Sequence, residues 1–166
     1  MTNIKSIPSV SVNYACNGSS TQANEMGMRA MQERAYEKRG EQYLLIKSPP
    51  ASGKSRALMF IALDKLYNQG LKKAIIVVPE KTIGASFNSE PLTQYGFWTD
   101  WEVAPQWNLC NAPGDDNGGK VGAVKAFLDS SDSILVCTHA TLRFAVDRFG
   151  VAAFDDCLIA VDEFHH

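Results

Sequence analysis

The amino-acid sequence predicts an α/β fold built around a mainly parallel central sheet. Short apolar runs of strand length alternate along the chain with longer stretches of helical periodicity. The runs are continuously apolar, which is typical of parallel strands that are covered on both faces. The clearest of them is the β-branched stretch 73–79. We expect right-handed crossovers between such strands, and ligands at their carboxyl ends.

The individual elements follow from the same patterns. Strands are expected at 42–48, 73–79, 133–138 and 157–161, and helices at about 24–39, 54–68, 120–129 and 140–148. The helix at 54–68 is apolar on most of its faces, and Gly70 is placed to end it as a C-cap. Residues 81–95 indicate a broken helix limited by Gly84 and Pro91, whereas residues 10–14 indicate either an edge strand or a loose arm.

Aromatic side chains gather between residues 96 and 111, namely Phe97, Trp98, Trp101 and Trp107. Such side chains can stack on bases, but we expect these to pack in the core or between elements. A short strand is expected around 107–110. Residues 114–119 indicate a solvated turn, because their paired aspartates lack the glutamate that completes a calcium loop.

Composition limits the class of protein. The chain has 166 residues, enough for one domain, with 45% hydrophobic and 20% charged residues and a net charge of −2. The net charge therefore gives no strong positive electrostatic field that would indicate a nucleic-acid partner, although a local positive surface can still bind one. The four cysteines have no Cys-x-x-Cys spacing, which favours reduced thiols. Without a signal peptide or membrane-length apolar run, we expect a soluble cytoplasmic protein with no membrane partner.

The stretch 48–55 reads Ser-Pro-Pro-Ala-Ser-Gly-Lys-Ser and lies between a predicted strand and a predicted helix. This is the setting in which a Gly-Lys-Ser ending forms a phosphate-binding loop, although Ser48 replaces the usual first glycine. Backbone N–H groups and the helix dipole attract an anion there. Lys54 would bind the terminal phosphates, the hydroxyl group of Ser55 would bind Mg²⁺, and Gly53 would allow close approach of the backbone.

A second polar motif, Asp162-Glu163, follows the apolar strand 157–161. Carboxylates at that position are costly unless they emerge at a sheet edge and meet a cation. Asp162 would hold Mg²⁺ through water, and Glu163 would orient and deprotonate an attacking water molecule. A polar turn is the alternative for the motif alone. The preceding Gly-Lys-Ser sequence makes a nucleotide-hydrolysis site the stronger interpretation.

In this order the motifs resemble those of superfamily 2 helicases and translocases of the DEAD/DEAH-box (DExH) type. Residues 48–55 resemble motif I, and 162–165, Asp-Glu-Phe-His, resemble motif II. Residues 77–81 lie where motif Ia is expected, and 136–142 resemble motif Ib. Arg29-Ala-Met-Gln32 resembles the Arg-x-x-Gln adenine-recognition motif, although periodicity alone would make it a solvated helix face. The family fold is the three-layer, RecA-like P-loop NTPase domain.

The resemblance implies roles for particular residues. ATP and Mg²⁺ would be the cofactors, with Lys54 and Glu163 as catalytic residues. The nucleotide would be held by Arg29, Gln32, Pro50, Ala51, Ser52, Gly53, Lys54, Ser55, Asp162 and His165. Gln32, with Arg29, would read the adenine, and His165 would couple hydrolysis to motion between two lobes. For His165 and His166, a flexible end or an expression artefact is the alternative, because adjacent histidines do not suit a zinc site.

The same resemblance implies a nucleic-acid partner, DNA or RNA. Its backbone would be contacted, without sequence readout, by Pro79, Glu80, Lys81, Thr138 and His139. We expect residues 1–27 to form an N-terminal extension and 28–166 a RecA-like lobe that stops after motif II. The second lobe supplies arginines worth roughly 10³-fold in rate, so the chain alone should bind nucleotide, hydrolyse it feebly and unwind nothing.

Three classes of function remain open from the sequence. The first is the ATP-binding lobe of a helicase or of the motor in a restriction-type defence enzyme. The second is another P-loop enzyme such as a small-molecule kinase, against which the Asp-Glu pair counts. The third is a degenerate, non-catalytic module, against which the intact Lys54, Ser55, Asp162 and Glu163 count.

Overall fold

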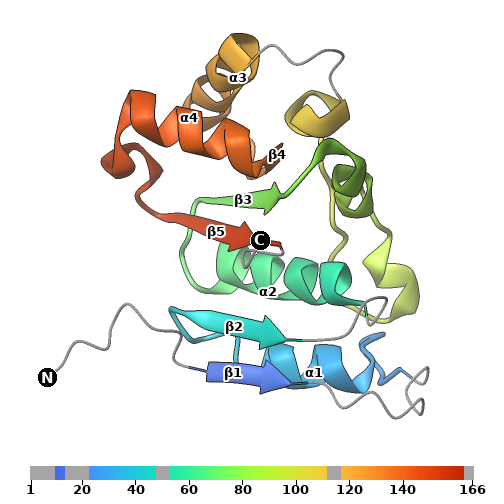
Figure 1. The fold of residues 1–166 in the computed structure, drawn as a ribbon. Helices are drawn as coiled ribbons and strands as arrows, with labels where there is room; N and C mark the ends of the chain where they lie inside the picture. The colour runs from blue at the N-terminus through green and yellow to red at the C-terminus, as the bar shows by residue number, and fades with distance from the viewer. Residues whose placement is uncertain (1–9, 14–22, 48–52, 112–116, 163–166) are drawn as a thin grey trace, which may run out of the picture. The chain divides into compact units, whose positions relative to one another are not determined.

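The structure is a computed structural model, and it describes residues 10–13, 23–47, 53–111 and 117–162 (Figure 1). The chain divides into two compact units. The first combines Met1–Lys65 with Pro91–Asp100, and the second combines Leu66–Glu90 with Trp101–His166. Each unit has its own parallel sheet, so the α/β class is confirmed.

The first unit holds a two-stranded sheet and two helices. Strand β1 (Val10–Asn13) pairs in parallel with β2 (Leu44–Lys47). Of the two possibilities for residues 10–14, an edge strand or a loose arm, the structure therefore shows a strand over Val10–Asn13. Helix α1 (Ala30–Glu37) precedes β2, and α2 (Lys54–Asn68) follows it and has the predicted bounds. The short 3₁₀ helix η3 (Leu92–Tyr95) completes the unit.

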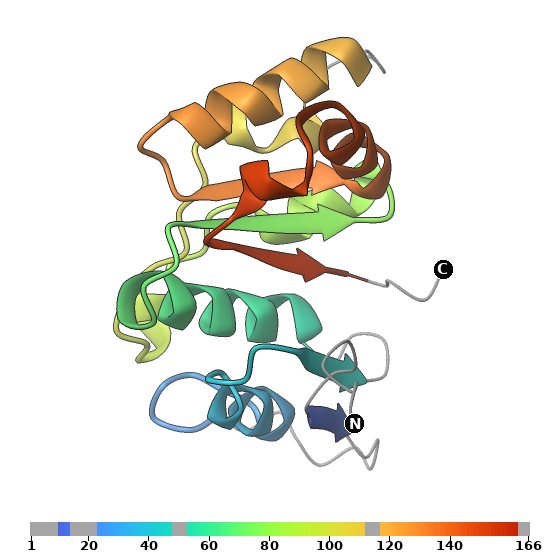
Figure 2. The same cartoon turned by 90° about the vertical axis from the view of Figure 1, so that its left-hand side faces the viewer.

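The second unit is built on a three-stranded parallel sheet in the order β4-β3-β5. Its strands are β3 (Lys73–Val78), β4 (Ile134–Thr138) and β5 (Cys157–Val161). Residues 74–78 of the central strand are at most 1% exposed, as predicted for a covered parallel strand. Helix α4 (His139–Phe149) packs against β3 and β4, and α3 (Asn117–Asp129) packs against α4 next to the β4 side of the sheet (Figure 2).

The pairing of the strands differs from the predicted single central sheet. Among the described residues, β2 pairs with β1 and does not join the three-stranded sheet. The alternation of apolar runs along the chain predicts which segments are strands. It does not determine their partners, because parallel strands pair across long crossovers rather than through a local turn.

Helix α1 is shorter than the predicted helix at 24–39 because Asn24 stabilises a competing turn. The side-chain oxygen of Asn24 accepts hydrogen bonds from the backbone N–H groups of Met26 and Met28, each at 2.9 Å. Asparagine commonly offers the backbone this alternative to a helix. The helical bonds therefore begin only at Arg29, whose carbonyl accepts from the N–H of Glu33 at 2.9 Å.

The segment between β3 and α3 is formed by 3₁₀ turns. They are η2 (Lys81–Phe87), η3, η4 (Pro105–Trp107) and η5 (Leu109–Asn111). The predicted strand at 107–110 is wrong, apart from an isolated parallel bridge between Asn108 and Val136. The amide group of Asn108 explains the turn, because it donates to the carbonyl of Gly84 at 3.1 Å and accepts from the N–H of Cys110 at 3.1 Å.

The aromatic side chains of this segment mainly pack, as expected. Phe97 is 4%, Trp101 0% and Trp107 9% exposed. Trp101 donates its indole N–H to the carbonyl of Phe87 at 2.9 Å, and Trp107 donates to Asp132 at 2.6 Å. Trp98 differs, because it is 42% exposed. None of the described helices has the length and apolar character needed to cross a membrane.

Candidate functional site

The structure describes part of the predicted site. Pro50, Ala51, Ser52, Glu163 and His165 lie outside the described residues. The other predicted residues are divided between the two units. The first unit holds Arg29, Gln32, Gly53, Lys54 and Ser55, and the second holds Pro79, Glu80, Lys81, Thr138, His139 and Asp162.

In the first unit, Gln32 connects the starts of two helices. Its side-chain oxygen accepts a hydrogen bond from the N–H of Arg29, the N-cap residue of α1, at 2.8 Å. Its amide nitrogen donates to the carbonyl of Gly53 at 2.9 Å. That carbonyl also accepts the first helical bond of α2, from the N–H of Ala57 at 3.1 Å. Gln32 is 3% exposed, so these bonds are made in a water-poor setting where losing them is costly.

Gly53 occupies a position that only glycine fits well. Its φ angle is +87°, in the left-handed region that other residues rarely adopt. A Cβ atom there would also clash with the amide nitrogen of Gln32 and would lie 3.7 Å from a guanidinium nitrogen of Arg29. The Arg-x-x-Gln residues and the Gly-Lys-Ser residues, 21 positions apart for Gln32 and Gly53, are thus in direct contact.

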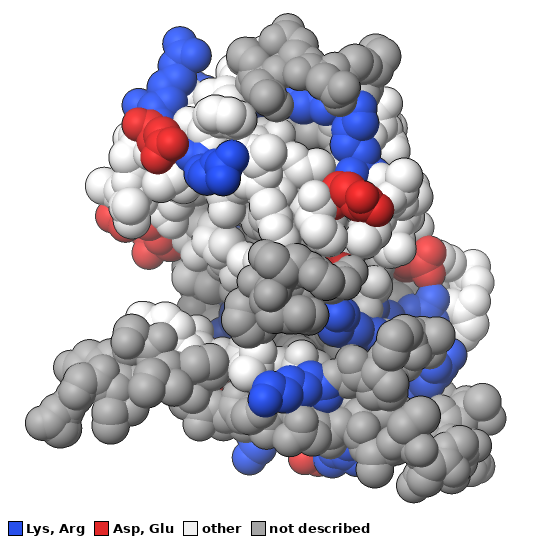
Figure 3. Space-filling model, viewed as in Figure 1, with Lys and Arg blue, Asp and Glu red and all other residues white. Residues whose placement is uncertain are grey.

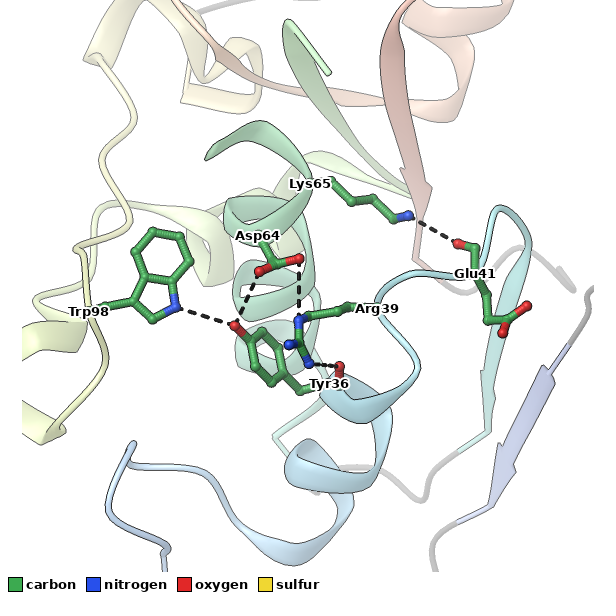
Figure 4. Close-up of polar contacts among 6 residues, drawn as sticks. All are labelled: Tyr36, Arg39, Glu41, Asp64, Lys65 and Trp98. Atoms are coloured by element: carbon green, nitrogen blue, oxygen red, sulfur yellow. Dashed lines mark hydrogen bonds and ion pairs between the residues drawn. The ribbon is translucent and has the colours of Figure 1, made fainter. Parts of the chain in front are cut away.

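A polar cluster joins the other end of α1 to α2 (Figure 4). Arg39 forms an ion pair with Asp64, whose carboxylate lies 3.3 Å from the guanidinium and whose side chain is 7% exposed. Tyr36 donates a long hydrogen bond of 3.4 Å to the same carboxylate. Trp98 donates its indole N–H to the hydroxyl group of Tyr36 at 3.2 Å, which adds the 91–100 segment to the cluster.

Lys65, next to Asp64, anchors the loop that precedes β2. Its ammonium group donates to the carbonyl of Glu41 at 3.0 Å. Burial lowers the pKa of Lys65 from its ordinary value, while the nearby charges of Asp64 and Glu41 oppose that shift. Sequence reasoning missed both residues. The available signal was an acid-base pair directly after the apolar run 57–63 of a helix, where charges are costly unless they are paired.

In the second unit, predicted site residues follow the carboxyl ends of all three strands. Pro79, Glu80 and Lys81 follow β3, His139 follows β4, and Asp162 follows β5. Because the strands are parallel and in register, these ends lie along one edge of the sheet. In α/β proteins with open parallel sheets, ligands bind at the edge formed by the carboxyl ends of the strands.

Asp162 is held through its backbone. Its N–H donates to the carbonyl of Val77 at 2.8 Å and continues the ladder between β5 and β3. Its carbonyl lies 3.1 Å from Nε2 of His139, which must carry the proton because a carbonyl only accepts. Asp162 is 5% exposed. His139, the residue directly after β4, is therefore hydrogen-bonded to the acidic motif that follows β5.

The remaining predicted residues of this edge are ordered by local bonds. The hydroxyl group of Thr138 accepts from the N–H of Thr141 at 3.3 Å and caps the start of α4. Glu80 accepts from the hydroxyl group of Thr82 at 3.0 Å at the start of η2. On the face drawn in Figure 3, Lys and Arg side chains of the described residues form several separate groups with acidic side chains between them.

Comparison with known proteins gives one relative and no match of other kinds. No protein-family model matches the sequence, and no solved structure matches it. Over 157 residues the chain is 56% identical to a Bacillus subtilis (strain 168) protein named "Putative ATP-dependent helicase YeeB". The alignment covers 95% of this chain and 26% of the relative. The chain is thus similar, over almost its whole length, to about a quarter of a protein that carries a helicase name.

Proposed function

We propose that this chain is the ATP-binding lobe of a nucleic-acid-dependent ATPase, a helicase or translocase of the DExH type with a RecA-like P-loop fold. The observation that carries the proposal is the double hydrogen bond of Gln32, which joins the N-cap of α1 to Gly53 of the Gly-Lys-Ser sequence. A solvated helix face, the alternative for Arg29 and Gln32, does not account for a glutamine that is 3% exposed. The helicase name of the relative supports the same function.

The chemistry of the residues fits an ATP site. Lys54 supplies a positive charge at the start of α2, where the helix dipole also favours a phosphate group. The hydroxyl group of Ser55 and the carboxylate of Asp162 are hard oxygen donors of the kind that Mg²⁺ prefers. Bound Mg²⁺ would neutralise charge on the phosphates. Glu163 would take the proton of the attacking water, and Arg29 and Gln32 would contact the adenine.

The nucleic-acid side of the function would lie at the edge formed by β3 and β4. Lys81 offers a charge to phosphates, and the start of α4 behind Thr138 offers backbone N–H groups. The hydrogen bond between His139 and the carbonyl of Asp162 supports a link from this edge to the acidic motif. Contacts of this kind position a strand without reading its sequence.

The chain spans 26% of the relative's length, and we propose that it is one part of a longer protein whose activity needs further domains. We propose that a second RecA-like lobe in the longer protein supplies arginines for hydrolysis and completes the motor. A restriction-type translocase would use the same lobe. A small-molecule kinase is not favoured, since it gives no role to Asp162-Glu163 after β5.

The test is ATP hydrolysis by the longer parent protein with no nucleic acid, single-stranded DNA, duplex DNA or RNA. We expect stimulation by at least one of them, loss of turnover in Lys54→Ala, and loss of turnover with retained ATP binding in Glu163→Gln. Lys125→Ala is the matched control, because Lys125 is exposed and pairs with Asp129 on the same helix. Basal turnover that depends on Lys54 but that no nucleic acid stimulates would refute the motor function and favour another P-loop enzyme.

A further inference from the structure

We propose that Tyr95 and Arg56 form a stacking platform for the base of the bound nucleotide, an inference that rests on the proposed ATP-binding function. Tyr95 ends η3 and is 53% exposed. The guanidinium carbon of Arg56 lies 5.1 Å from the centroid of the Tyr95 ring. Both residues belong to the first unit, which also holds Arg29, Gln32 and Gly53.

The backbone around Tyr95 lies in close contact with residues 25–27, which lead into α1. A Cβ atom on Gly27 would lie 2.7 Å from Cβ and 2.8 Å from the carbonyl oxygen of Tyr95. A Cβ atom on Gly96 would clash with the carbonyl of Glu25. Residues 25–27 directly precede Met28 and Arg29, so Tyr95 is placed beside the start of the Arg-x-x-Gln element.

Arg56 approaches the same region from the other helix. It lies in the first turn of α2, three residues after Gly53, whose carbonyl accepts the hydrogen bond from Gln32. The segment 25–32 thus touches Tyr95 through Gly27 and touches the start of α2 through Gln32. An exposed aromatic ring and a guanidinium group are thereby gathered next to the residues proposed to bind the phosphates.

The burial and hydrogen bonds of Gln32 explain why a separate stacking group would help to bind the base. Gln32 is 3% exposed, and both ends of its amide group are hydrogen-bonded within the protein. One donor and one acceptor position of this amide group are thereby used within the protein, and a base that Gln32 contacts through the remaining positions would gain affinity from a stacking group nearby. Aromatic rings and arginine planes supply it by stacking on the π-face that every base presents. A purine, with its two fused rings, is the ligand whose face best matches a tyrosine ring flanked by arginine.

The test compares ATP with inorganic tripolyphosphate, which has the phosphates but no base, as ligands of the longer parent protein in the presence of Mg²⁺. We expect Tyr95→Ala to raise the Kd for ATP about tenfold, the effect of losing one stacked base, and to leave the Kd for tripolyphosphate unchanged. Alanine keeps the Cβ atom that meets Gly27, so the backbone contact persists. Tyr95→Trp should retain ATP affinity, whereas Tyr95→Leu, with bulk but no aromatic face, should lose it.

Tyr67→Ala is the matched control, since Tyr67 is a 65% exposed tyrosine near the far end of α2. Equal losses for ATP and tripolyphosphate in Tyr95→Ala would indicate a structural role and overturn the platform. Unchanged ATP affinity would overturn it as well, and so would a loss of affinity for DNA or RNA alone. If the wild-type protein bound tripolyphosphate and ATP equally weakly, the proposed ATP function would fall first, and the platform with it.

Discussion

Replacing Gly53 with alanine should loosen helix α1, although the two residues that meet are far apart in sequence. The substitution has two effects. It forces a residue with a Cβ atom into a φ angle of +87°, and it places that atom against the amide nitrogen of Gln32. Gly70→Ala is a matched control, because Gly70 has a φ angle of +79° but no atom within 4 Å of the added Cβ.

The expected magnitudes follow from these contacts. The left-handed conformation costs about 1–2 kcal/mol for a residue with a Cβ atom, and this cost is common to both variants. Gln32 can yield by moving its side chain, but it then loses its bonds to Arg29 and Gly53 while buried. An unsatisfied buried polar group costs about 1–3 kcal/mol. Gly53→Ala should therefore cost about 2–5 kcal/mol and Gly70→Ala about 1–2 kcal/mol.

Native-state hydrogen exchange separates the two effects, because it reports the opening free energy of each segment. Gly53→Ala should lower the protection of the backbone amides of α1, and Gly70→Ala should not. In the double variant Gln32→Ala with Gly53→Ala, the clash is absent, so the combined loss should be about 1–3 kcal/mol smaller than the sum of the single losses. Equal loss of α1 protection in the two glycine variants, or strict additivity with Gln32→Ala, would refute the link between Gln32 and Gly53.

Two further predictions concern buried groups. Asp64→Ala should cost about 2 kcal/mol, between the values for buried and surface pairs, because the side chain of Asp64 is 7% and that of Arg39 40% exposed. Asp64→Asn removes the charge but keeps an oxygen that can accept from Tyr36, so it should cost less than Asp64→Ala but more than zero. Chemical denaturation followed by tryptophan fluorescence measures both costs, and a cost near zero for Asp64→Asn would contradict a role for the charge. Burial raises the pKa of Cys137 to about 12, from 9.0 when unfolded. Below pH 9 the Cys137 thiol keeps its proton in both the folded and the unfolded state. Between pH 9 and about 12 only the folded state keeps it, so the free energy of unfolding should fall by up to about 1.4 kcal/mol per pH unit. Cys137→Ala should remove that part of the slope in denaturation midpoints measured from pH 8 to 11; an unchanged slope would contradict the buried thiol.

Local patterns in the sequence determined most of the regular elements. Helix α2 forms over the predicted residues 54–68, and the continuous apolar run of β3 became the buried centre of a parallel sheet. Periodicity and β-branching act over a few neighbouring residues, so they can be read without knowledge of the fold. The sequence also indicated the carboxyl ends of β3, β4 and β5 as a ligand edge, since parallel strands share that edge.

Hydrogen bonds between asparagine side chains and the backbone, which compete with helix and strand bonds, decided where several elements begin or end. Asn24 shortens α1 by binding the N–H groups of Met26 and Met28, and Asn108 replaces a predicted strand with 3₁₀ turns by binding Gly84 and Cys110. Each asparagine has a backbone partner that a periodicity count does not consider. The turn at Asn24 is local and could have been anticipated from asparagine's preference for such bonds, whereas Asn108 binds a residue 24 positions away.

Only the tertiary structure decided which strands pair and which distant side chains meet. Neither the pairing of β2 with β1 nor the contact of Tyr95 with Gly27 is visible in the spacing of residues. The sequence singled out Gln32 and Gly53 separately, each by its motif. Their hydrogen bond, and the ion pair between Arg39 and Asp64, exist because α1 packs along α2. Such packing is set by the fit of whole surfaces, which local patterns constrain but do not specify.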